Sequence, residues 1–92
     1  MRKIEAQMLK AIISRKNWSQ ANTEVVIGFQ DTAQVFLHGN HIANVEPCGF
    51  VRVNFNTLAK WPTNTTKSRL RALGCDVRTR DFVTYVDGTA VA

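Results

Sequence analysis

The sequence predicts one α+β domain, in which a mainly antiparallel β-sheet carries an N-terminal helix and a second short helix. Three observations predict it. Apolar residues recur at helical spacing in the first segment, residues alternate by twos in the middle, and turn dipeptides join the later strands. The 92 residues are 45% hydrophobic, which suits a single globular domain. No repeat or long linker divides them, so we expect one domain over residues 1–92.

The N-terminal helix is expected from Arg2 to Lys16. Ile4, Met8 and Ile12 fall on one helical face, and nothing in the segment breaks a helix. Asn17 is expected to end it, because asparagine tolerates the left-handed conformation that follows many helices.

The central segment is expected to form an antiparallel meander, with one face on the core and the other partly in water. Gly39-Asn40 is the expected two-residue turn between its second and third strands, since both residues accept positive φ. The four expected strands are 23–29, 33–38, 41–46 and 50–55.

The last third should begin at Trp61-Pro62, because a residue before proline avoids helical geometry. Thr63 or Asn64 should cap a short helix over 65–73. A C-terminal hairpin should follow, with Asp87-Gly88 as its strongest turn signal. The extended segments expected there are 77–79, 82–86 and 89–92.

Most aromatic side chains are expected in the core. Five phenylalanines and Tyr85 fall in expected strands, and a small domain has few other large residues to bury. We therefore expect at least four of these six in the core. Trp61, beside Lys60 at an element boundary, is the best candidate for an exposed stacking residue.

The formal charge of +5 is concentrated in residues 2–16 and 60–80, and only Asp76 opposes the second group. Two basic ends around a near-neutral centre suggest a nucleic acid or an acidic protein face as partner, although a solvated surface would show the same pattern. The candidate binding residues are Lys60, Trp61, Lys67, Arg69, Arg71, Arg78 and Arg80.

Within that group, the segment 60–71 places hydroxyls, free amides and cations at a helix N-terminus, as a phosphate backbone would require. Helix capping alone would also explain its threonines and Asn64. Lys67 and Arg71 are expected on one solvated flank, where alanine should leave stability unchanged, and Arg69 on the opposite flank.

Catalytic and metal-binding patterns are missing from the sequence. The carboxylates occur singly, and the glycines form no phosphate-binding loop. His38, His41, Cys48 and Cys75 lack the paired spacing of a zinc site. We therefore expect no enzyme activity, no cofactor and no metal. Two isolated cysteines suit a reducing cytosol, so no disulfide is expected.

No apolar run approaches the roughly 18 residues that would indicate a membrane span. The N-terminal stretch is amphipathic and lacks the features of a signal peptide. The expected location is therefore the cytoplasm, with no membrane partner.

Several short motifs resemble a family of small proteins from tailed bacteriophages. They are Asn17-Trp18, Asn22-Thr23, the hairpin 37–43, the block 65–70 and Ala72-Leu73. The resemblance implies an accessory protein that works in the cytoplasm of the infected bacterium. Such proteins typically bind nucleic acid or block a host factor, and no functional residue carries over.

The leading hypothesis is a non-catalytic nucleic-acid-binding accessory protein. The alternative is a protein-binding modulator or inhibitor that grips an acidic face of a host or phage enzyme. A minor virion role is a third possibility. DNA or RNA, base preference and oligomeric state stay open.

Overall fold

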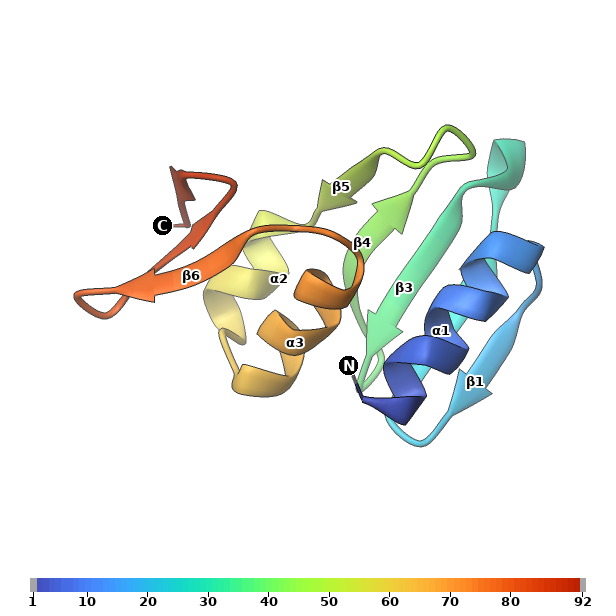
Figure 1. Ribbon diagram of the computed structural model, residues 1–92, viewed down its shortest axis with the longest axis horizontal. Helices are drawn as coiled ribbons and strands as arrows, with labels where there is room; N and C mark the ends of the chain where they lie inside the picture. Colours follow the sequence, from blue (N-terminus) through green and yellow to red (C-terminus); the bar gives the residue numbers. More distant parts are fainter. Residues whose placement is uncertain (1, 92) are drawn as a thin grey trace.

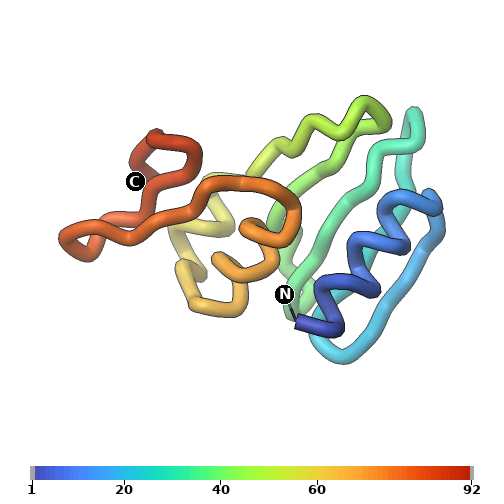
Figure 2. The backbone as a smooth tube through the Cα atoms, viewed as in Figure 1, coloured from blue at the N-terminus to red at the C-terminus, as the bar shows by residue number. Residues whose placement is uncertain are grey.

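A computed structural model describes residues 2–91 of the chain. Helices cover one face of a five-stranded antiparallel sheet, and a smaller three-stranded sheet extends away from this body (Figure 1; the chain path is followed in Figure 2). The predicted α+β class, with its meander and C-terminal hairpin, is confirmed. The projecting sheet lies along the longest axis of the molecule, whose extents are 38 × 25 × 21 Å.

Helix α1 spans Lys3–Ser14 and buries the apolar face that the sequence predicts, including Met8 and Ile12. It ends at Arg15, which takes the left-handed conformation (φ 52°) expected for Asn17. The Arg15 guanidinium donates hydrogen bonds to two carbonyl oxygens, that of Val45 at the end of β4 (3.4 Å) and that of the following residue, Glu46 (3.2 Å). These bonds to a distant strand favour ending the helix at Arg15.

The large sheet is a meander in the order β1-β2-β3-β4-β5, with every neighbour antiparallel. Strand β1 was not predicted, because three residues are too few to show an alternating pattern. The strands are β1 Trp18–Gln20, β2 Thr23–Ile27, β3 Ala33–Leu37, β4 Asn40–Val45 and β5 Val51–Val53. A short 3-10 turn, Phe29–Asp31, joins β2 to β3.

The β3–β4 hairpin turns one residue earlier than predicted. His38 and Gly39 occupy the turn, with φ of 51° and 78°, and Asn40 already belongs to β4. Two consecutive positive φ values match the right-handed twist of the paired strands. The His38 amide also donates to the Asn22 carbonyl at 2.7 Å, which stabilises the earlier turn.

Two further helices follow the sheet, α2 over Phe55–Lys60 and α3 over Asn64–Ala72. Helix α2 was missed, because Phe55 continues the alternation of the preceding strand. Its signal was Asn54, whose side chain accepts a hydrogen bond from the Thr57 amide at 3.2 Å. The predicted capping of α3 is confirmed, with Thr63 Oγ1 accepting from the Thr66 amide at 3.1 Å.

The small sheet consists of β6 Val77–Arg80, β7 Val83–Val86 and β8 Thr89–Ala90. Asp87-Gly88 forms the predicted turn between β7 and β8. Asp81-Phe82 forms the turn between β6 and β7, at the projecting end of the sheet. We call β6, β7 and their turn the hairpin; Val77 and Val86, both buried, hold its base.

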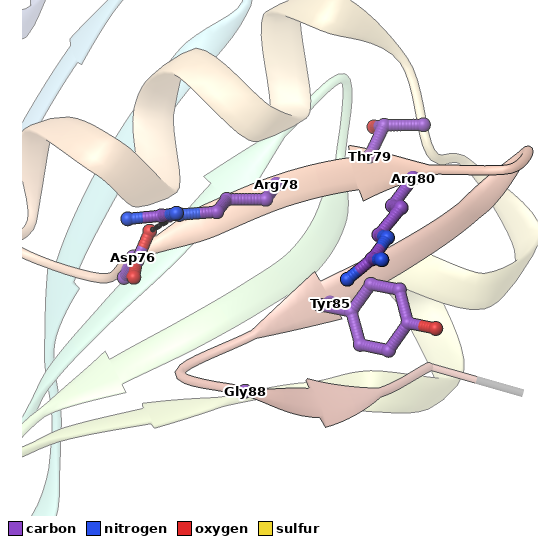
Figure 3. A pocket seen from close by; sticks show the side chains of 6 residues that line it. All are labelled: Asp76, Arg78, Thr79, Arg80, Tyr85 and Gly88. Carbon is purple, nitrogen blue, oxygen red and sulfur yellow. Dashed lines mark hydrogen bonds and ion pairs between the residues drawn. The ribbon is translucent and has the colours of Figure 1, made fainter.

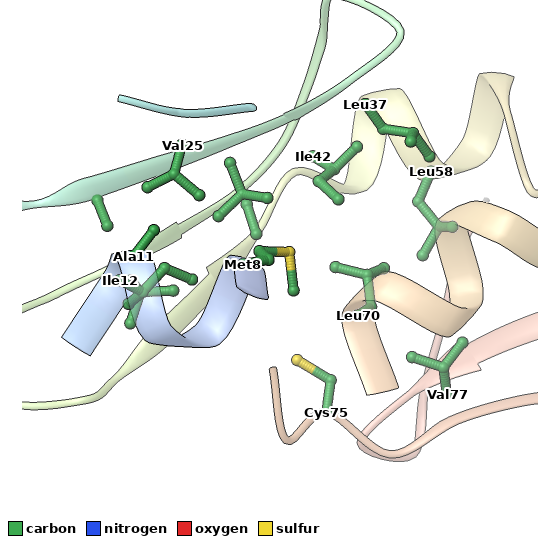
Figure 4. Packing of buried hydrophobic residues seen from close by; sticks show 14 of the residues in the cluster. Met8, Ala11, Ile12, Val25, Leu37, Ile42, Leu58, Leu70, Cys75 and Val77 are labelled. Carbon is green, nitrogen blue, oxygen red and sulfur yellow. The ribbon is translucent and has the colours of Figure 1, made fainter. Parts of the chain in front are cut away.

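The core is aliphatic (Figure 4). Its largest fully buried side chains are Met8, Val25, Val35, Ile42, Leu58 and Leu70. The expectation that at least four of the six aromatic residues are core is wrong, since none of them is buried. Phe29, Phe50, Phe55 and Phe82 stand in turns or at the ends of elements, where their side chains face water. Short aliphatic residues fill the narrow space between helices and sheet instead.

No helix of the described residues covers the second face of the large sheet, which carries mixed polar residues (Figure 1). There His41 packs against Phe36 and its ring nitrogens contact the amide side chains of Asn44 and Asn54 at 2.6 and 3.2 Å. Residues 2–91 contain no group of three or more His, Cys, Asp or Glu placed to hold a metal ion. Within the same residues, no helix is both long and apolar enough to cross a membrane.

Cys48 is exposed, whereas Cys75 is buried at the base of the hairpin. Burial, and to a smaller extent the charge of Asp87, raises the pKa of the Cys75 thiol. That the two cysteines form no disulfide in the native protein stays a prediction for a thiol count.

Candidate nucleic-acid interface

Charge in this molecule is segregated between the helical layer and the strands. The segments 2–16 and 55–73, which contain the three helices, hold nine of the 12 lysines and arginines but only one of the seven carboxylates. The other three cations and six carboxylates lie on strands and turns. The helical side is therefore strongly cationic, and the positive field is concentrated there.

The single carboxylate of the helical layer, Glu5, is removed from the surface. It lies 2.8 Å from the Arg69 guanidinium, with each side chain only 3% exposed. The Ser68 hydroxyl also donates to it. Burial raises the pKa of Glu5, but the hydrogen bonds from Ser68 and Arg69 outweigh burial and lower it below its ordinary value. Glu5 therefore stays ionised, but its charge neutralises the buried Arg69 and does not reduce the positive charge of the exposed lysines and arginines.

The outer side of α1 presents two lysines in line. Lys3 and Lys10 are seven residues apart, opposite the buried face, and both are exposed. At 1.5 Å per residue their backbones are about 10 Å apart. The two exposed ammonium groups thus lie in line on the outer side of α1, where each can contact a phosphate.

A shallow hollow of about 260 Å³ continues this surface at the end of α1. It is bordered by Lys10, Lys16, Asn17 and Trp18. The Trp18 indole packs partly against the core, so its position is fixed. We call the exposed cations of this side the basic helix surface: Arg2, Lys3, Lys10, Lys16 and Arg71. Arg71 joins it through a neighbouring hollow that it shares with Glu5 and Ser68.

Two of the predicted binding residues prove to be internal. Arg69 is buried in its ion pair with Glu5, and Lys67 is only 9% exposed. The Lys67 ammonium donates to Thr79 Oγ1 at 2.6 Å, which ties α3 to β6. The expected solvated position is therefore wrong for Lys67, and Arg69 is too deeply buried to serve as the expected binding residue. Sequence spacing placed them on α3 but could not show which neighbouring element covers each flank.

Arg71 is exposed but also has a structural contact. Its Nε donates to the Val77 carbonyl at 2.9 Å, so α3 holds β6 through a second cation. Lys60 and Trp61 are exposed at the end of α2, where Trp61 borders a separate hollow with Leu37 and Ile42. The predicted binding residues are thus divided among α3, the end of α2 and the hairpin.

The remaining predicted residues, Arg78 and Arg80, share one face of the hairpin with Tyr85 (Figure 3). They border a broad, shallow hollow of about 620 Å³. Arg78 is paired with Asp76 at 2.8 Å, and both side chains are exposed. Residues 76–91 contain two arginines and three aspartates. This face is therefore near-neutral, in contrast to the helical layer.

Lys3 and Lys10 are not among the binding residues that the sequence predicts, although they contribute to the basic first segment. The signal for Lys3 and Lys10 was present, since they repeat at seven residues opposite an apolar stripe. The loss of Glu5 from the surface had no signal in the sequence, because it depends on a contact with α3, 64 residues away.

The fold and this surface define a small α+β protein with a cationic helical layer over a neutral to acidic sheet. The family model described as "Kyanoviridae Gp96 protein" matches residues 1–92, and the chain belongs to that family. Since Kyanoviridae are tailed phages of cyanobacteria, the expected phage family is confirmed. No curated protein and no solved structure matches the chain.

Proposed function

We propose that this phage protein binds nucleic acid, without catalysing a reaction on it, in the cytoplasm of the infected cell. One observation supports the proposal above the others. The outer surface of the helical layer carries lysines and arginines, and the only carboxylate of that layer is buried against Arg69. A phosphate backbone approaching this side meets no exposed carboxylate of the three helices.

The composition of the surface favours contacts to the backbone over reading of bases. Lysines act as mobile point charges on phosphate, and such contacts position a protein without discriminating sequence. Binding should therefore be similar for unrelated sequences. An acidic protein face would meet the same cations, which makes it the competing partner.

The basic helix surface predicts a steep dependence of binding on salt. If about four of its five cations each neutralise one phosphate, log affinity for duplex DNA should fall against log salt with a slope of about −3.6. Fluorescence anisotropy with a labelled 20-base-pair duplex, from 50 to 300 mM salt, measures that slope. Absence of binding to both this duplex and its separated single strand at 50 mM salt, or a slope near zero, would rule out the proposal.

A pull-down from infected-cell lysate, with and without nuclease, separates the two kinds of partner. Proteins recovered only through nucleic acid should disappear after nuclease treatment. A protein retained at full yield after nuclease, and released by 0.5 M salt, would favour the acidic-face alternative.

A further inference from the structure

We propose that Phe82, at the tip of the hairpin, stacks on an unpaired base, so that single-stranded nucleic acid is the preferred ligand. This inference rests on the proposed function and assigns to the hairpin a task distinct from that of the basic helix surface.

Phe82 lies in the turn between β6 and β7, and this turn is at the end of the hairpin that projects from the body (Figure 1). Its relative exposure is 102%, so the ring contacts almost nothing else in the protein. The hairpin that carries it is held to α3 by Lys67 on Thr79 and by Arg71 on the Val77 carbonyl. The ring is thus presented to solvent on an anchored support.

The backbone at Phe82 adds an independent observation. Phe82 has φ 64° and Asp81 has φ 51°, both in the left-handed region. A bulky residue is strained there, whereas glycine adopts the conformation freely. This turn therefore holds a phenyl ring where glycine would be the more stable choice. Other non-glycine residues of the described part of the chain, such as Arg15 and His38, also have positive φ, but Phe82 is the one phenylalanine among them, and strained backbone of this kind clusters at ligand-binding positions.

The hairpin that carries the ring also has side chains that suit a nucleotide. Arg78, Arg80 and Tyr85 lie on one face of the hairpin, and the Arg80 side chain extends toward Tyr85 (Figure 3). Asp81 in the turn, together with Asp76 and Asp87 at the base of the hairpin, keeps this region near-neutral overall. Its contribution should therefore come from stacking, with little release of counterions.

The apolar area at the tip favours a base over a protein pocket. Arg80 and Asp81 precede the ring, and Val83 is the one apolar residue beside it. A stable protein interface needs about 800 Å² from each partner, with an apolar centre. One ring cannot form such a centre, but it is all that one stacked base requires.

The test compares a 12-nucleotide single strand with a duplex of the same sequence, using Phe82→Leu and Phe82→Gly. Both variants should weaken single-strand binding by about 5- to 150-fold, the range that base–aromatic stacking spans. Duplex affinity and the salt slope should not change. Phe82→Tyr should retain most of the affinity. The matched control is Phe29→Leu, since Phe29 is 85% exposed in another turn, and it should have no effect.

Stability provides a second readout. Phe82→Gly should raise the midpoint of urea unfolding because it relieves the strained turn, so loss of binding cannot result from misfolding. Wild-type binding to both ligands with no loss in Phe82→Leu would overturn this inference alone. If the wild-type protein binds neither the single strand nor the duplex, the proposed function and this inference are both overturned. A photocrosslinker at position 82 that captures a protein in place of the oligonucleotide would also overturn the inference.

Discussion

Replacing Glu5 by alanine should destabilise the protein by about 3–5 kcal/mol, because it leaves the Arg69 charge buried without a partner. Arg69 is 3% exposed, and its other contacts are to the side-chain oxygens of Thr23 and Asn22, at 3.0 and 3.4 Å. Neither neutral group can replace a carboxylate. A loss of this size is a large share of the 5–15 kcal/mol that holds a typical domain folded.

Urea unfolding, followed by circular dichroism, measures the change in free energy of unfolding. Glu24→Ala is the matched control, since Glu24 is an exposed carboxylate on β2 and its loss should change stability by less than about 0.5 kcal/mol. The double variant Glu5→Ala/Arg69→Met should recover part of the loss, because it removes the unpaired charge. A Glu5→Ala effect no larger than that of Glu24→Ala would contradict this account.

The Glu5–Arg69 ion pair makes the free energy of unfolding depend on pH. The folded pKa of Glu5 is lowered below its ordinary value of 4.5, so below that value the unfolded state binds more protons than the folded state. The stabilisation that ionised Glu5 provides is therefore complete above about pH 4.5. It is lost as the pH falls through the lowered pKa of Glu5 in the folded protein. The stability difference between wild type and Glu5→Gln should shrink over that acidic range.

The double substitution Lys3→Ala/Lys10→Ala should make the salt slope for duplex DNA shallower by about 1.8, since each lost phosphate contact contributes about 0.9. At 0.1 M salt the affinity should fall by roughly one to two orders of magnitude. Stability should hold, because both side chains are exposed and alanine is the better helix former.

The matched control is Arg52→Ala/Arg78→Ala, which lowers the formal charge of +5 by the same amount. Both arginines are already paired, Arg52 with Glu46 at 2.9 Å and Arg78 with Asp76 at 2.8 Å. They should contribute little to the slope. Equal slopes for the two double variants would show that net charge alone drives binding, and that the basic helix surface is not the interface.

Local sequence signals predicted much of the fold. The apolar stripe of α1, the strand alternation, the Thr63 cap and the Asp87-Gly88 turn each depend on residues within a few positions of one another. Helix α2 was missed because Phe55 fitted both the preceding strand and a helix start. Such short elements are decided by capping and packing, and periodicity does not reveal them.

The candidate site was harder to predict, because burial of a charged residue depends on distant partners. Lys67 and Arg69 are in the same basic run as Arg71. They are nevertheless buried, Lys67 against Thr79 of β6 and Arg69 against Glu5 of α1. A phenylalanine is usually expected in the core, but Phe82 is fully exposed. The pairing of Arg80 with Val83 leaves Asp81 and Phe82 in the two-residue turn between β6 and β7. Composition gave the net charge, and the fold decided where that charge lies.

The most direct test of the basic helix surface is a map of backbone amide chemical shifts, recorded while a 12-base-pair duplex is titrated into the ¹⁵N-labelled protein. The account predicts the largest shifts in residues 2–18 and around Arg71, and small ones on the open sheet face that carries Glu24, His41 and Arg52. Shifts confined to that open face, or no shifts at millimolar duplex, would contradict it.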